Sequence, residues 1–147
     1  AERVKISFKE ICNGWLQVQV QLEEVLFCFT ASYVPYDSIY ELAKGLFIFA
    51  STSTAQTIKW NTEPVEYDFF FQDTGQARFE IVEYPDSRRL KGMGNIRFAS
   101  NSALKSLVVP FWQALRELEN NEQFEELWKH PFPQNEMDLL TNLVKTL

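Results

Sequence analysis

Residues 15–29, WLQVQVQLEEVLFCF, carry the clearest secondary-structure pattern of the chain. Apolar residues alternate with glutamines in its first half, and the alternation resumes after the glutamate pair at 23–24. Such alternation is typical of β-strands that bury one face. A turn at the glutamate pair places Val20 opposite Phe27, and the apolar residues of both strands then share one face. The sequence therefore predicts an antiparallel hairpin here.

This hairpin also bears on the two cysteines of the chain. Its register places Cys28 opposite Gln19 rather than opposite Cys12, so a disulfide between the cysteines would contradict it. Two cysteines are too few for a disulfide framework, and no charged and apolar leader precedes the first strand. We therefore expect a reducing, cytoplasmic location.

Further elements follow along the chain. Residues 38–50 carry apolar side chains at helical spacing, and Ser38 with Glu41 predicts a capping box at the start of this helix. A second hairpin is predicted around a loop at 73–75, which sets Phe71 opposite Ala77. Beyond Ser102 the spacing becomes helical again.

Pro110 lies inside the first helical stretch of the C-terminal region, and it predicts a kink or division near Leu107 because proline cannot donate its backbone hydrogen bond. The whole pattern predicts one α+β domain over residues 1–147. Its antiparallel sheet has about 5–7 strands built from hairpins, and one face is covered by a central helix and the C-terminal helices.

The net charge of the chain limits the kinds of partner that it is expected to bind. With 20 acidic and 14 basic residues, the formal net charge is -6. An acidic chain is repelled by nucleic acid and by the anionic surface of a membrane, whereas a basic protein is attracted to it. The apolar runs are also much shorter than the roughly 20 residues of a membrane-spanning helix. We expect a protein partner, with basic character, and neither nucleic acid nor membrane.

Catalytic signals are weak. The single histidine, His130, lies far in sequence from both cysteines, and two potential ligands such as Glu126 and His130 do not make a metal site. Paired carboxylates such as Glu66 and Asp68 fall on hydrophilic faces, where we expect them to be solvated. The sequence thus predicts no enzyme activity, no metal and no cofactor.

Two groups of residues are candidates for partner binding. The acidic group is expected to steer a basic partner, although a merely solvated face is the alternative. Tyr33 and Tyr36 flank Pro35, and tyrosines are favoured at interface centres, although packing at the rim of the core is the alternative. The acidic candidates are Glu117, Glu119, Glu122, Glu125 and Glu126.

A basic, glycine-containing loop offers a different function. Its spacing does not match a phosphate-binding loop, but its side chains are candidates for holding an anionic ligand, and a mobile hairpin loop is the alternative. The candidates are Arg88, Arg89, Lys91 and Arg97.

Residues 4–84 combine an N-terminal hairpin, the helix at 38–50 and the step at residues 60–64, WNTEP, into an aromatic strand. In these features the chain resembles small acidic bacterial immunity proteins of polymorphic or contact-dependent toxin systems. The resemblance implies a protein that neutralises a basic toxin or nuclease by occlusion. The other two hypotheses are a secretion-chaperone-like protein that binds an extended client, and an anion-binding or small-molecule-binding protein. The oligomeric state stays open.

Overall fold

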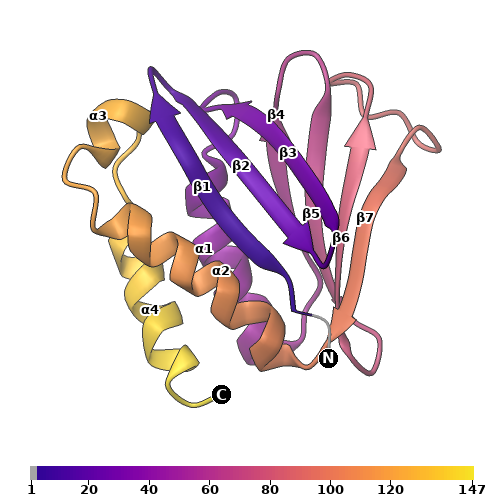
Figure 1. Ribbon diagram of the computed structural model, residues 1–147, viewed down its shortest axis with the longest axis vertical. Coiled ribbons are helices and arrows are strands. Elements are labelled where there is room, and N and C mark those ends of the chain that lie inside the picture. The colour runs from indigo at the N-terminus through magenta and orange to yellow at the C-terminus, as the bar shows by residue number, and fades with distance from the viewer. Residues whose placement is uncertain (1–2) are drawn as a thin grey trace.

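The computed structural model describes residues 3–147 and shows an α+β fold with one seven-stranded antiparallel sheet, its strands in sequential order (Figure 1). The strands are β1 (Lys5–Cys12), β2 (Trp15–Leu22), β3 (Val25–Ser32), β4 (Gln56–Asn61), β5 (Glu66–Asp73), β6 (Ala77–Tyr84) and β7 (Asn95–Ser102). The helices are α1 (Ser38–Thr52), α2 (Leu104–Glu119), α3 (Phe124–Trp128) and α4 (Gln134–Val144). This confirms the predicted sheet and its helical cover. No helix within residues 3–147 has both the length and the apolarity to cross a membrane.

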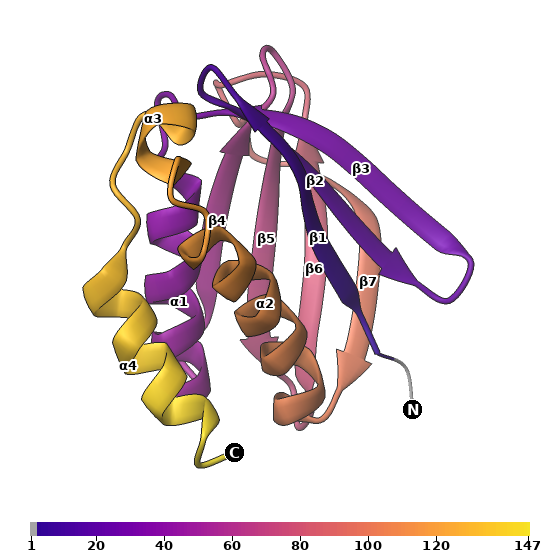
Figure 2. The ribbon, with the colours of Figure 1, turned by 60° about the vertical axis from the view of Figure 1, so that its left-hand side comes forward.

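The sheet divides into two parts between β3 and β4. These neighbours share a single bridging pair, Ser32 with Asn61, so β1–β3 run at an angle to β4–β7, and the helices lie on one side (Figure 2). Aromatic rings fill the angle: the Phe29 ring centroid lies 4.9 Å from that of Tyr67 and 5.6 Å from that of Trp60. Ring packing thus joins the two parts where backbone pairing stops.

Helix α2 is fixed to the sheet by Phe111. Its ring makes edge contacts with Phe71 and Phe79, both at 5.2 Å between centroids, and with Phe69 at 6.0 Å. All four rings are fully buried. Burying each contributes roughly 1.5–3 kcal/mol, with a further increment from edge-to-face geometry. Part of the aromatic content of the chain therefore joins helix α2 to the sheet.

The predicted register of the first hairpin is confirmed. Val20 pairs with Phe27 and Gln19 pairs with Cys28, around a turn at the two glutamates. Both cysteines are free, as this register requires. The alternation and the turn were sufficient to predict this register, because both are visible in the local sequence.

The predicted register of the second hairpin is wrong by two residues. Phe71 pairs with Phe79, and Asp73 pairs with Ala77. The loop is one residue later than expected because Asp73 still belongs to the strand, and its Oδ1 accepts the Gly75 N–H at 2.9 Å to close the turn. A shift of two residues keeps every side chain on its expected face.

The start of α1 also differs from the prediction. Asp37, not Ser38, is the N-cap, and its Oδ1 accepts the Tyr40 N–H at 3.3 Å. The Ser38 hydroxyl instead donates to the Lys59 carbonyl at 2.5 Å, and Glu41 Oε1 accepts the Lys59 N–H. The two expected capping-box residues therefore bind α1 to the edge of β4.

Helix α2 continues through Pro110, so the predicted division near Leu107 is wrong. Pro110 is buried and lines a groove together with Val4 and Ile6 of the N-terminal strand region. A proline inside a helix costs about 3 kcal/mol. Packing of this apolar face against the sheet outweighs that cost.

Candidate binding surfaces

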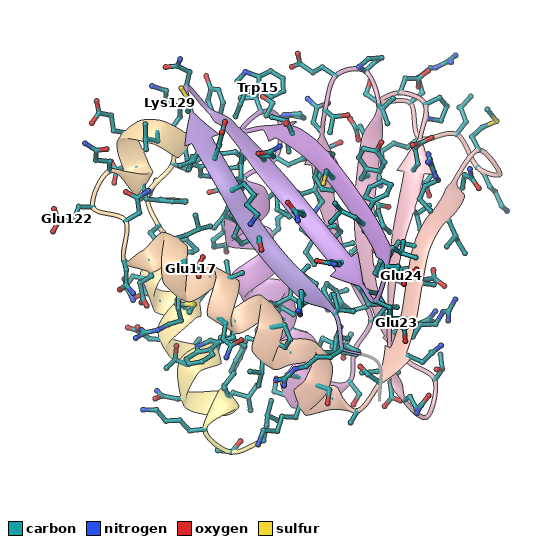
Figure 3. The ribbon with its side chains drawn as sticks, viewed as in Figure 1. Trp15, Glu23, Glu24, Glu117, Glu122 and Lys129 are labelled. Atoms are coloured by element: carbon teal, nitrogen blue, oxygen red, sulfur yellow. The ribbon has the colours of Figure 1, made fainter. Side chains whose placement is uncertain are left out.

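Four of the predicted glutamates lie exposed at the end of α2, in the turn after it and in α3. Glu117, Glu122, Glu125 and Glu126 form no ion pair within residues 3–147. Figure 3 shows Glu117 and Glu122 on the helical side of the molecule, well separated from the glutamates at the tip of the β2–β3 hairpin. We call these four residues the acidic surface.

Glu119 has a different role from the other glutamates. Its Oε1 pairs with Arg116 Nη1 at 2.5 Å, and its Oε2 accepts a hydrogen bond from Gln134 Nε2, also at 2.5 Å. Its side chain is only 12% exposed. It therefore connects α2 to α4, and its charge is already compensated.

Tyr33 packs against the β1–β2 turn and against His130. Its ring lies over Gly14, so closely that an added Cβ at Gly14 would come within 2.3 Å of it. The Tyr33 carbonyl oxygen lies 2.9 Å from His130 Nε2, and the two rings are in contact. The residue thus holds the segment after α3 against the β1–β2 turn.

The N-cap of α1, Asp37, also binds helix α3. Asp37 Oδ1 also accepts the indole N–H of Trp128 at 3.0 Å, and the Trp128 side chain is fully buried. The segment 33–37 therefore holds α3, and with it the acidic surface, in a fixed position.

Tyr36 belongs to a buried ionic network on the other side of this segment. Its hydroxyl donates to Glu66 Oε1 at 2.8 Å, and Arg89 Nη1 donates to the same oxygen at 2.9 Å. The second guanidinium nitrogen of Arg89 pairs with Asp68. Glu66 is fully buried and Asp68 is 6% exposed. The expectation that both carboxylates are solvated is wrong.

Glu66 and Asp68 are buried because the β6–β7 loop, residues 85–94, folds back over the outer face of the sheet. The Arg89 guanidinium lies 4.6 Å above the Tyr84 ring centroid, and Gly94 packs against Tyr84 and Val82. The loop thereby covers a face that strand alternation alone assigns to solvent. Arg89 compensates the charge that this cover buries.

The network alters the acid–base properties of its members. Burial raises the pKa of Asp68, although the hydrogen bond and charge of Arg89 oppose the rise. Burial, together with the hydrogen bond to Glu66, raises the pKa of Tyr36 to about 12. Tyr36 therefore stays a phenol, and acts as a hydrogen-bond donor rather than as a base.

Three of the four predicted anion-binding residues, the arginines, are paired with carboxylates. Arg88 pairs with Asp86 at 2.8 Å, Arg97 pairs with Glu83 at 2.7 Å, and Arg89 is held in the buried network, while Lys91 is exposed in the same loop. An anion at any of the three arginines has to compete with a carboxylate already in place.

A depression next to the network brings together three loops. Its volume is about 410 Å³, and its lining residues are Pro35, Asn61, Glu63, Pro64, Glu66, Asp86 and Ser87. Glu66 Oε2 is buried and has no hydrogen-bond partner among residues 3–147. No sequence pattern indicates this depression, because its residues are spread over more than 50 positions of the chain. Within residues 3–147, no three or more His, Cys, Asp or Glu side chains are grouped so as to hold a metal ion.

Comparison with known proteins gives no match to a family model, to a curated protein or to a solved structure. The function has to be argued from the charges, contacts and depressions of the chain itself.

Proposed function

We propose that this chain is a non-enzymatic protein-binding module that recognises a basic partner through the acidic surface. The observation that carries the proposal is the set of exposed glutamates without ion pairs on α2 and α3, in a chain of net charge -6. Uncompensated carboxylates on one surface attract a cationic partner and raise the association rate.

The acidic surface is also rigidly supported. Helix α3 is anchored by the buried side chains of Phe124 and Trp128, and the latter is bonded to the cap of α1. A surface that is ordered before binding loses less conformational entropy when a partner docks. The arrangement therefore favours specific binding over a diffuse charge effect.

In its specific form, the proposal is an immunity-type inhibitor that neutralises a basic toxin or nuclease by occlusion. It rests on the resemblance of residues 4–84 to such proteins, and occlusion needs only a stable, complementary surface. The two exposed free cysteines support a reducing, cytoplasmic location as part of this proposal.

The experiment is capture of the partner by cross-linking in the source organism, followed by affinity measurement with the purified partner. The test variant is Glu122→Gln/Glu125→Gln. The control variant, Glu23→Gln/Glu24→Gln, makes the same charge change at the hairpin tip, away from the acidic surface (Figure 3).

We expect a lysine- and arginine-rich partner whose association rate falls about tenfold or more with the test variant and little with the control. The rate should also fall with added salt. An acidic partner, or equal losses for both variants, would contradict the proposal.

A further inference from the structure

Helices α1 and α4 leave an apolar groove between them on their solvent-facing side. The two helices pack side by side (Figure 2), and the groove has a volume of about 240 Å³. Its lining residues are Lys44, Phe47 and Ile48 of α1, with Glu136 and Leu139 of α4. Three of these side chains are large and apolar, so covering the groove would remove apolar surface from water, which is favourable.

Leu139 lies on the wrong face of α4 for a helix that only covers a core. The helix packs against the rest of the protein through Met137 and Leu140, which are fully buried, whereas Leu139 is 50% exposed. A single exposed leucine is ordinary on a protein surface. This one, however, shares its groove with Phe47 and Ile48, which are themselves only partly buried. The apolar surface therefore extends over both helices.

The charges on the two sides of the groove select its occupant. Lys44 lies on the α1 side and Glu136 on the α4 side, and neither forms an ion pair within residues 3–147. The Lys44 ammonium contacts the Tyr40 ring, 5.7 Å from its centroid, which leaves its charge uncompensated. A basic partner would meet Lys44, and an acidic partner would meet Glu136. A second copy of this chain carries both charges and can oppose each with its complement.

We propose that the groove is the interface of a symmetric homodimer, in which α1 of each copy lies over α4 of the other. A two-fold axis along the groove produces this arrangement. Because Lys44 and Glu136 line the same short groove, the axis sets each lysine opposite the glutamate of the other copy. The four helices then bury the apolar lining of both grooves together. The inference does not rest on the proposed function, because no residue of the acidic surface lines the groove.

The first test is the mass of the full chain in solution, measured by sedimentation equilibrium over a range of concentrations. We expect reversible dimers, and Leu139→Glu should weaken their association about tenfold or more, because it places a charge in the apolar contact. The matched control is Leu90→Glu, the same change at a leucine that is 49% exposed in the β6–β7 loop, and it should leave the association unchanged. A chain that stays monomeric up to about 1 mM overturns the inference and leaves the groove to a different protein.

The second test uses the two-fold symmetry. Lys44→Glu alone and Glu136→Lys alone each oppose like charges between identical copies, so each variant should self-associate about tenfold or more weakly than the unmodified chain. Mixed in equal amounts, the two variants again oppose every charge with its complement. They should then form a heterodimer about as readily as the unmodified chain forms its homodimer, which also shows that both variants are folded. Failure of the mixture to associate overturns the inference.

Pairing through a sheet edge is the other route to a dimer, because β1 and β7 each have a neighbouring strand on one side only among residues 3–147. Such a dimer would resist Leu139→Glu as well as it resists Leu90→Glu, and this outcome also overturns the inference. The proposed function is decided separately, by Glu122→Gln/Glu125→Gln, because both of these residues lie outside the groove.

Discussion

Replacing Arg89 by Met should destabilise the protein strongly and in a pH-dependent way. The substitution keeps an apolar side chain of similar length but removes the charge that pairs with Glu66 and Asp68. Breaking a buried ion pair by removing one partner costs about 3–5 kcal/mol. The Arg89 side chain is 17% exposed, which places the expected cost near the lower end, at about 3 kcal/mol at pH 8.

The sign of the pH dependence follows from Asp68. Burial raises the folded-state pKa of Asp68 above the ordinary value of an aspartate, 3.8, so its favourable contribution to stability is complete below that value and is lost as the pH rises through the folded pKa. Loss of Arg89 removes the main opposing influence and raises this pKa further. The variant should therefore be closest to the unmodified protein near pH 4 and furthest from it at pH 8.

The assay is urea unfolding followed by tryptophan fluorescence at both pH values. A loss of about 3 kcal/mol lowers the midpoint by roughly 1.5 M if the urea m-value is about 2 kcal/mol/M. Arg88→Met is the matched control, because that side chain is 70% exposed and solvent screens its pair with Asp86, so its urea midpoint should hardly change. A cost for Arg89→Met as small as the control, or equal at both pH values, would refute the reasoning.

Two further substitutions test how the segment 33–37 is held. Asp37→Ala removes the cap of α1 and the partner of the Trp128 indole, and should cost about 1–3 kcal/mol in urea unfolding, whereas Asp37→Asn, which keeps an acceptor, should cost much less. Gly14→Ala places a methyl group against the Tyr33 ring at a backbone φ of +79°, and should cost about 2 kcal/mol or more in thermal unfolding; a smaller loss would show that the Tyr33 ring moves aside easily.

The parts of the fold that the sequence predicted are those set by local patterns. The pairing of Val20 with Phe27 follows from alternation and a two-residue turn, and both are visible in the chain. The second hairpin was displaced because a side-chain bond, from Asp73 to the Gly75 N–H, selects the loop. The helix cap moved to Asp37 because Ser38 bonds to β4, a tertiary contact that no local pattern shows.

The candidate site could not be predicted because its burial arises from a non-local cover. Alternation places Glu66 and Asp68 on the outer face of β5, and that assignment is correct. The error lay in equating this face with solvent, since the β6–β7 loop covers it. Phe70 lies on the same face as Asp68 and is partly buried, so an apolar residue among the acidic ones was the available signal of a cover.

The folding of this loop and the properties of the depression are linked by the same residues. The loop brings Arg89 to Glu66 Oε1, and it also brings Asp86 and Ser87 to the rim above Glu66. The shape of the depression and the stability of the outer face are therefore two measures of one arrangement, and Arg89→Met should disturb both together.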